Sequence, residues 1–222
     1  IMSAMDFPRV IIHNSISIDG ALLDFDVHME HHYRIVGQFH AQAHLIGSNT
    51  IKEGIKRYGT VSEETDKDFS KPVRDETLPY WMIIDSTGKL EGLLHEVRRF
   101  ELNRDVIVCV SKKTPPSYID YLKKRQYSYH VIGDDKVDLE KMMDCISREY
   151  QVDTVLVDSG RILGDILLNN GMVSSVSILI HPFLVGEKGY YLFSDISKRI
   201  RLKLERSEII DDEYVWLFYH KQ

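Results

Sequence analysis

The chain has 222 residues, enough for one large domain or two small ones with a sizeable hydrophobic core. Its 43% hydrophobic and 28% charged residues are ordinary for a soluble globular protein. A net charge of −6 disfavours a nucleic-acid or acidic-membrane binder, since such proteins usually present a basic face. Cys109 and Cys145 lie in apolar strand and helix patterns, which favours a reduced chain over a disulfide scaffold. No run approaches the ~18 apolar residues of a membrane span, and no signal-peptide apolar region precedes the first strand, so we expect a cytoplasmic protein.

The first half of the chain combines strands and helices with one long polar segment. The predicted elements are a buried strand over 9–13, a turn at Asp19-Gly20, a helix from 27 to about 43 leading into a strand that ends at Gly47, and a helix over 49–58 capped by Ser48 or Thr50. Residues 58–79 are polar and carry the charge cluster SEETDKDFSK. We interpret them as a surface loop or active-site flap.

The second half alternates strands and helices before it ends in strands only. The predicted strands are 80–85, 106–110, 127–132 and 154–157, and the helices are 116–126, 139–150 and 162–170, the last ended by Gly171. The strands 176–181, 190–193, 202–210 and 214–219 follow, with Asp211-Asp212-Glu213 joining the last two as a hairpin. This order predicts one α/β domain with a mostly parallel sheet, helices on both faces and a C-terminal antiparallel hairpin.

Small or polar residues follow four of the predicted strands. They are Gly47 to Thr50, Asp85-Ser86, Ser111 to Lys113, and Asp158 to Gly160. Ligands bind at such carboxyl ends in open parallel sheets, and Ser159-Gly160 before a helix would let a phosphate approach backbone N–H groups at the positive helix end. Turn residues follow strands in many folds, so one loop alone specifies little. The chain has neither G-x-G-x-x-G nor G-x-x-x-x-G-K-[ST], so a bound dinucleotide would use another scaffold.

Five histidines invite a metal hypothesis that their spacing does not sustain. His28/His32 and His40/His44 are each four residues apart, a usable ligand spacing on a helix, and His31 lies between the first two. HMEHH differs from H-E-x-x-H and no spacing fixes a third ligand, so we expect no metal. A Ser-His-Asp hydrolase is also disfavoured, because there is no G-x-S-x-G.

Five motifs occur in a recognisable order. They are SIDG at 17–20, G-x-x-T at 47–50, Asp-Ser at 85–86, LGDILLNNGMV at 163–173, and PFLVG at 182–186 before Leu192-Phe193. In this order the chain resembles the pyrimidine reductases of riboflavin biosynthesis, which also form the C-terminal half of the bifunctional deaminase-reductase. The resemblance covers residues 9–220, and the block at 163–173 is its most specific part.

The resemblance implies a three-layer dihydrofolate-reductase-like fold and one reductase domain over residues 1–222. It also implies NADPH as cofactor and hydride transfer to C1′ of the open-chain ribose of a pyrimidine ribose 5′-phosphate, so that a ribosylamino group becomes ribitylamino. Asp19 would be the catalytic residue, orienting hydroxyls or assisting proton transfer; its alternative is an ordinary turn-forming Asp before Gly. A homodimer is implied too, with the late strands as its interface.

The implied binding residues fall into two sets. The cofactor set consists of Gly47, Ser48, Thr50, Asp85, Ser86, Ser159, Gly160, Arg161 and Ile162. To it we add Ser111 and Lys112 for the adenosine 2′-phosphate, because a hydroxyl and an ammonium suit a dianion; a solvated lysine pair, Lys112-Lys113, is the alternative. The substrate set consists of Ser17 and Asp19, with Lys56, Arg57 and Arg161 as candidates for the substrate phosphate.

Three departures from the family pattern keep other functions open. Ser159 stands where the family has glycine, and serine is poorer at positive φ and at close backbone approach. IKEGIKR at 51–57 replaces the usual Asp-Asp-Pro and Thr-Val-Arg segments, and His40 and His44 stand where Arg and Asp are usual. The alternatives are a dihydrofolate-reductase-like oxidoreductase acting on another small substrate, or a nucleotide-binding module without turnover.

Overall fold

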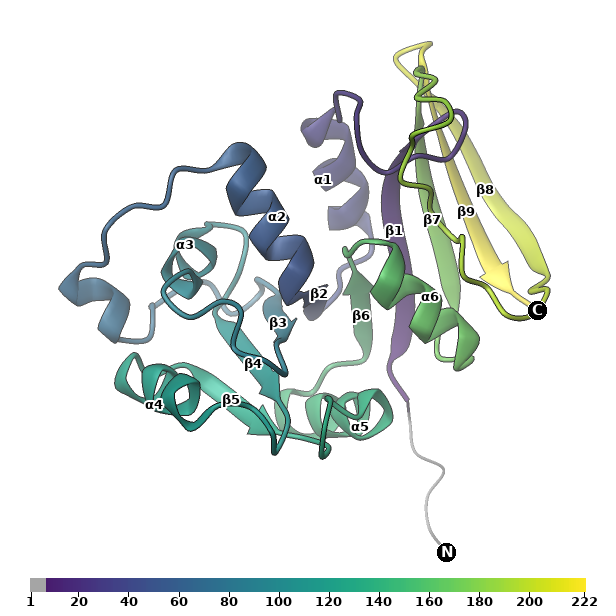
Figure 1. Cartoon of the computed structure of the whole chain (residues 1–222). Helices are drawn as coiled ribbons and strands as arrows, with labels where there is room; N and C mark the ends of the chain where they lie inside the picture. Colours follow the sequence, from purple (N-terminus) through teal and green to yellow (C-terminus); the bar gives the residue numbers. More distant parts are fainter. Residues whose placement is uncertain (1–6) are drawn as a thin grey trace, which may run out of the picture. The chain divides into compact units, whose positions relative to one another are not determined.

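The computed structural model describes residues 7–222, which form two compact units (Figure 1). The first unit contains Ala41–Asp153 with residues 7–8, and the second contains Arg9–His40 and Thr154–Gln222. The single reductase domain over 1–222 stays a prediction. We expect no signal peptide at the N-terminus, but residues 1–6 of that segment lie outside the described residues. No helix of residues 7–222 is long and apolar enough to cross a membrane.

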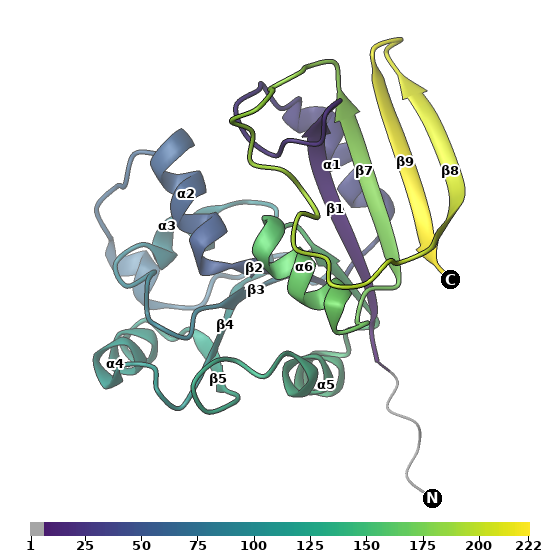
Figure 2. The ribbon, with the colours of Figure 1, turned by 45° about the vertical axis from the view of Figure 1, so that its right-hand side comes forward.

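The first unit is built on four parallel strands. They are β2 (Ala43–Gly47), β3 (Tyr80–Ile84), β4 (Val106–Val110) and β5 (Ser128–Val131), in the order β5-β4-β3-β2 (Figure 2). Because all four run in the same direction, the loops that follow them emerge at one edge of this sheet. The predicted bounds of β4 are confirmed, and the other three predicted strands are present with one or both ends shifted by one residue.

Helices cover both faces of this sheet. They are α2 (Ser48–Tyr58), α3 (Leu94–Arg99), α4 (Pro116–Lys124) and α5 (Leu139–Tyr150), while the 3₁₀ helix η1 (Asp66–Phe69) belongs to the polar segment after α2. Val106, Val108 and Val110 pack in one core cluster with residues of α2, α3 and α4. Side chains alternate along a strand, so Cys109 lies on the other face, where α5 contacts His130 of β5. The N-cap of α2 is Gly47 rather than the predicted Ser48 or Thr50, because the helix already begins at Ser48.

Arginines fasten the polar segment that follows α2. Arg99 pairs with Asp68 at 2.6 Å, and Arg125 donates two hydrogen bonds of 2.6 Å to Glu64. The buried Arg98 donates to the backbone carbonyls of Asp68 and Ser70, both at 3.2 Å. Apart from η1 the segment is irregular, as predicted, but these contacts tie it to its own unit.

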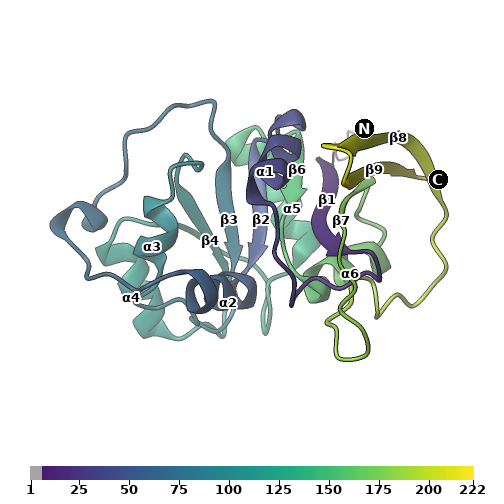
Figure 3. The same cartoon turned by 90° about the horizontal axis from the view of Figure 1, so that it is seen from above.

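The second unit has a mixed sheet with the order β6-β1-β7-β9-β8. Its strands are β1 (Arg9–Ser17), β6 (Thr154–Val157), β7 (Ser175–His181), β8 (Leu202–Ile210) and β9 (Tyr214–Lys221), seen from above in Figure 3. β1 is parallel to β6 and β7, whereas β9 is antiparallel to both β7 and β8. The predicted C-terminal hairpin is confirmed. Asp211 and Asp212 turn it with φ of 51° and 56°, values that Asp tolerates better than most residues.

One predicted strand of the second unit is wrong. Residues 190–193 form no strand; a single bridge joins Tyr191 to Ala21. Phe193 has φ of 56°, which ends the extended run, and Gly186 is left-handed as well, with φ of 84°. The segment is therefore a loop that begins at the end of β7 and leads to β8.

Two helices lie on opposite faces of β1. In α6 (Arg161–Asn169), a Cβ added to Gly164 would lie 3.7 Å from Ile12 Cδ1, so this helix packs on the Ile12 side. In α1 (Met29–Gln38), His32 is hydrogen-bonded to Ser15, whose side chain is on the other face because Ser15 lies three positions after Ile12 in the strand. Gly171 follows α6 with φ of 73°, as predicted for a residue just beyond a helix C-terminus.

Candidate functional site

The turn from β6 to α6 consists of Asp158, Ser159 and Gly160. Gly160 is the N-cap of α6 with φ −67° and ψ 177°, and no side chain caps the helix. Ser159 is buried, and both Ser159 and Gly160 keep negative φ. Serine at position 159 therefore requires no backbone conformation that favours glycine. The departure from the family pattern is compatible with this turn.

Two side chains of the second unit, Asn14 and His32, form hydrogen bonds with this turn. Asn14 of β1, only 5% exposed, donates from Nδ2 to the Ser159 carbonyl at 3.0 Å. His32 of α1 joins Asp158 Oδ2 through Nε2 at 3.3 Å and Ser15 Oγ through Nδ1 at 3.0 Å. Asn14 was not among the predicted site residues, because the first strand was predicted to end at His13, and His32 was considered only as a metal ligand. The signal that could have found Asn14 is the polar run HNSIS directly after an apolar strand.

Burial keeps the histidines beside His32 neutral. The His13 ring centroid lies 4.5 Å from that of His32, and His13 Nδ1 is hydrogen-bonded to Ser177 Oγ at 2.8 Å. Burial, helped by the nearby His32, holds the pKa of His13 well below its ordinary value. Burial also lowers the pKa of His181 at the end of β7. Protonation of His13 or His181 at acidic pH would therefore place a positive charge in a buried region, which is unfavourable.

Ser15, His32 and Asp158 have the residue types of a hydrolytic triad but not its exposure. Ser15 is 7% exposed and lies in the middle of β1 under α1, so a substrate carbonyl cannot reach its hydroxyl. The three side chains instead connect β1, α1 and the turn after β6. Their arrangement is that of a positioning network.

His28 and His31, two other histidines of the metal hypothesis, have partners of their own. His28 Nδ1 accepts the His31 backbone N–H, and the two rings stack with centroids 3.7 Å apart. His31 Nε2 lies 2.9 Å from Asp211 Oδ2, and the His28 backbone N–H donates to His181 Nε2 at 3.0 Å. His28 and His32 thus do not converge on one point, despite their spacing of four residues.

Asp19 clamps the loop that follows β7. Its carboxylate accepts hydrogen bonds from Ser17 Oγ at 2.5 Å, from the Gly186 N–H at 2.8 Å and from the Val185 N–H at 3.2 Å. The bond from Ser17, followed by that from Gly186, lowers the pKa of Asp19. Asp19 is therefore an anion at neutral pH and suits an orienting role better than that of a proton donor. Beside it, Ile18 and Leu184 are 61% and 75% exposed.

In the first unit, β2 passes into α2 without an intervening loop. Gly47 is the N-cap, and Ser48 and Thr50 form the first turn of the helix. Asp85, 1% exposed, accepts from the N–H groups of Lys89 and Leu90, both at 3.0 Å. This carboxylate stabilises the turn after β3 through backbone hydrogen bonds, and it is not exposed at the surface.

The residues suggested for a 2′-phosphate differ in accessibility. Ser111 is buried, and its hydroxyl donates to the Asp135 carbonyl at 3.2 Å. Lys112 is exposed and its Nζ lies 2.8 Å from Asp134 Oδ1, an interaction that raises the pKa of Lys112. Ser86 Oγ is likewise used, since it accepts the Val137 N–H at 3.1 Å. Of this group, the ammonium of Lys112 is the one that points to solvent.

The predicted site residues divide between the two units. The first unit holds Gly47, Ser48, Thr50, Lys56, Arg57, Asp85, Ser86, Ser111 and Lys112, and the second holds Ser17, Asp19, Ser159, Gly160, Arg161 and Ile162. In each unit most of them follow strands at their carboxyl ends. Lys56 and Arg57 lie apart from these loops, exposed in the last turn of α2.

Comparison with known proteins decides the family. The sequence model of the RibD C-terminal domain matches residues 8–216. The chain belongs to the RibD C-terminal domain family. A search of curated proteins found no match.

Solved structures show the fold of this RibD C-terminal domain. RibD of Acinetobacter baumannii is 17% identical with a TM-score of 0.68, over 98% of this chain and 59% of that one. Riboflavin biosynthesis reductase Rib7 of Saccharomyces cerevisiae is 19% identical with a TM-score of 0.70, over 100% and 93% of the two chains. Dihydrofolate reductase of Enterococcus faecalis, solved with NADP(H), is 8% identical with a TM-score of 0.51, over 96% of each chain. The predicted dihydrofolate-reductase-like α/β fold, with its mostly parallel strands and antiparallel C-terminal strands, is confirmed. The chain spans little more than half of the Acinetobacter RibD.

Proposed function

We propose that this RibD C-terminal domain is an NADPH-dependent reductase of riboflavin biosynthesis. Its substrate would be a diaminopyrimidinone or aminouracil ribose 5′-phosphate, whose ribosylamino group is reduced to ribitylamino. The observation that carries the proposal is the β6–turn–α6 segment, in which Ser159-Gly160 lies at a helix N-terminus within a family match over residues 8–216. The yeast relative is itself described as a riboflavin biosynthesis reductase.

The turn after β6 fits the pyrophosphate of a dinucleotide. A small residue followed by glycine leaves room for a phosphate at the helix N-terminus, where the helix dipole favours an anion. Asn14 holds the Ser159 carbonyl, so the turn is already fixed before a ligand arrives. Arg161, whose guanidinium lies 4.2 Å above the Tyr190 ring, adds a positive charge at the first position of α6.

The other proposed cofactor contacts come from the first unit. Gly47, Ser48 and Thr50 would approach a phosphate at the start of α2, as the family resemblance implies. Lys112 would bind the 2′-phosphate by exchanging its exposed partner Asp134 for a dianion. Ser111 would contribute through the shape of its turn, because its hydroxyl is buried and already donated.

Catalysis by the chain's own residues would consist mainly of positioning. When bound, NADPH supplies the hydride that C1′ of the open-chain ribose accepts. The ionised Asp19 would accept hydrogen bonds from substrate hydroxyls and hold residues 182–186 in place. Exposed apolar side chains such as Ile18, Leu184 and Ile162 would exclude water from the reacting atoms.

A homodimer remains part of the proposal, with β8 as its interface strand. β8 is the edge strand of its sheet and nine residues long, so one side of its backbone is available for pairing. Leu204 and Ile209 on this strand are 48% and 71% exposed. Sedimentation of the wild type and of Ile209→Lys tests this point, and a wild-type monomer at assay concentration would contradict it.

Ligand binding and turnover can be measured separately. We expect NADPH to raise the melting temperature more than NADH does, and we expect NADPH oxidation when the ribosylaminopyrimidine phosphate is added. Binding without turnover would indicate another small substrate or a nucleotide-binding module. Failure to bind either cofactor would contradict the proposal.

A bulky side chain in the β6–α6 turn tests the cofactor site directly. Gly160→Val should weaken NADPH binding at least tenfold, because its branched side chain would occupy the approach to the turn. Gly37→Val is the matched control, since a Cβ at Gly37 in α1 meets nothing within 4 Å. Equal affinity in the two variants would remove the turn from the cofactor site.

A further inference from the structure

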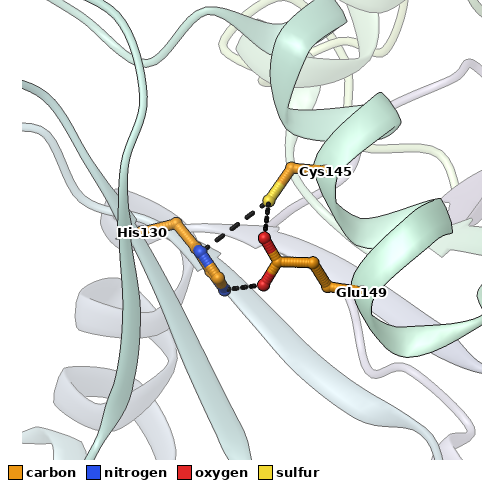
Figure 4. A group of neighbouring side chains, drawn as sticks. All are labelled: His130, Cys145 and Glu149. Carbon is orange, nitrogen blue, oxygen red and sulfur yellow. Dashed lines mark hydrogen bonds and ion pairs between the residues drawn. The ribbon is translucent and has the colours of Figure 1, made fainter.

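Three side chains of different chemistry converge on the α5 face of the first unit. His130 projects from β5, and Cys145 and Glu149 project from α5, four residues apart and therefore on one side of the helix (Figure 4). One ligand atom from each lies within 4.8 Å of the other two. None of these residues belongs to the proposed cofactor or substrate set, so the cluster has no part in the proposed function.

Two separations match the edges of a tetrahedral zinc site, and the third pair of side chains approaches through the other ring nitrogen, with His130 Nε2 3.7 Å from Glu149 Oε2. His130 Nδ1 lies 3.7 Å from Cys145 Sγ, and Cys145 Sγ lies 3.5 Å from Glu149 Oε1. Zinc bonds of ~2.3 Å to sulfur and ~2.0–2.2 Å to nitrogen or oxygen, held at tetrahedral angles, place sulfur roughly 3.5–3.6 Å from each neighbour. The thiol is thus already at ligand distance from both partners.

The second nitrogen of His130 is fixed in the way that metal-bound histidines are. His130 Nε2 lies 2.7 Å from the Tyr150 hydroxyl, which orients the ring and leaves Nδ1 facing Cys145. Histidine ligands usually donate their other ring N–H to an outer partner, which fixes both tautomer and orientation. Tyr150 supplies such a partner.

The cluster is enclosed on one side and open on the other. The His130 side chain is 18% exposed and that of Glu149 is 56% exposed. Sulfur, imidazole and carboxylate together are a donor set that zinc accepts, whereas magnesium and calcium prefer oxygen alone. Three protein ligands and an open side leave the fourth position to water. Without an ion, the same side chains would form a plain hydrogen-bonded group.

We propose that His130, Cys145 and Glu149 bind one Zn²⁺ per chain, with water as the fourth ligand. The ion would join α5 to β5 and so stabilise the outer part of the first unit. Its binding does not depend on a nucleotide or on turnover.

Co²⁺ is the spectroscopic probe for this site, and Zn²⁺ is the competitor. After chelator treatment, one equivalent of Co²⁺ should give thiolate-to-metal charge-transfer and tetrahedral d–d absorption, and one equivalent of Zn²⁺ should abolish both. Cys145→Ala should lose the charge-transfer band, although the other thiol, Cys109, is still present. Tyr150→Phe should weaken Zn²⁺ binding ~10- to 100-fold through the lost outer hydrogen bond.

Matched carboxylate variants on the same helix make the test specific. Glu149→Gln removes the proposed ligand, whereas Asp144→Asn removes a carboxylate that pairs with Arg148 on the same helix. We expect at least a tenfold loss of Zn²⁺ affinity in the first and no change in the second. Zn²⁺ should also raise the melting temperature of the wild type but not of Cys145→Ala. Absence of the charge-transfer band in the wild type, or Zn²⁺ affinity equal in the wild type and Cys145→Ala, would overturn the proposal.

Discussion

Lowering the pH from 6.5 to 5.5 should destabilise the fold through its buried histidines. The pKa of His13 is held well below 6.5 in the folded protein by burial, and that of His181 is lowered by burial too. In the unfolded chain both regain an ordinary pKa near 6.5. The unfolded state therefore binds more protons below pH 6.5, so stability falls as the pH falls through this value. Above it both states are neutral and the effect vanishes.

The magnitude follows from proton linkage. If a histidine stays neutral in the folded state, the unfolding free energy falls by about 1 kcal/mol between pH 6.5 and 5.5. Below pH 5.5 it falls by ~1.4 kcal/mol for each further pH unit. His13 should contribute this full amount, and His181 a smaller one, giving a total of about 1–2 kcal/mol. Asp68 does not contribute in this window, because hydrogen bonds from Arg99 and Thr65 outweigh its burial and lower its pKa to about 2.

Urea denaturation at pH 7.5, 6.5 and 5.5 measures this effect. His13→Asn keeps a donor or acceptor for Ser177 but cannot be protonated, so its loss between pH 6.5 and 5.5 should be smaller than that of the wild type by about 1 kcal/mol. His40→Asn is the matched control, since His40 is exposed and its φ of 46° suits asparagine. A pH dependence equal in the wild type and His13→Asn would show that protonation of His13 does not cause the destabilisation.

Three substitutions test other parts of the account. Arg98→Ala leaves Asp105 without its buried partner and should cost about 3–5 kcal/mol of unfolding free energy. Arg104→Ala breaks a pair with the exposed Glu76 and should cost less than about 1 kcal/mol, so similar losses in urea denaturation would contradict this reasoning. Asn14→Leu removes the hydrogen bond that Asn14 donates to the Ser159 carbonyl, and it should raise the NADPH dissociation constant about tenfold, corresponding to ~1.4 kcal/mol. An unchanged dissociation constant in fluorescence titration would show that this hydrogen bond does not contribute to cofactor binding. Asp19→Asn weakens the hydrogen bonds from the Val185 and Gly186 N–H groups, and it should raise KM for the pyrimidine more than KM for NADPH. Equal effects on the two KM values in steady-state kinetics would argue against substrate orientation by Asp19.

Local patterns predicted the elements whose residues are uniformly apolar or strongly periodic. Val106–Val110 is a wholly buried strand and Leu139–Tyr150 a capped amphipathic helix, and both bounds are confirmed. The predicted first strand stops short of the end of β1 because residues 13–17 are polar apart from Ile16, and their burial is decided by α1 and by the β6–α6 turn. The short α3 has too few apolar positions for a periodic signal, and residues 190–193 look extended but include a left-handed Phe193.

The candidate site could be predicted only where its residues are neighbours in sequence. The sequence around Asp158 to Gly160 predicts a strand–turn–helix segment. Asn14, in contrast, is 145 residues away in sequence from Ser159, whose carbonyl accepts its hydrogen bond. The hydrogen bonds that occupy Ser111 and Asp85 also come from the folded turns. Residue type alone therefore suggested a phosphate ligand at Ser111 where the fold uses the hydroxyl internally.

Transfer of a labelled hydride tests the proposed reaction itself. The protein is mixed with NADPH deuterated at the transferable C4 position and with the ribosylaminopyrimidine 5′-phosphate, and the product is analysed by mass spectrometry. We predict a ribitylamino product that carries one deuterium at C1′, formed by the wild type and greatly diminished in Gly160→Val. A folded wild-type protein that binds NADPH but yields no deuterated ribitylamino product would contradict the proposed reaction.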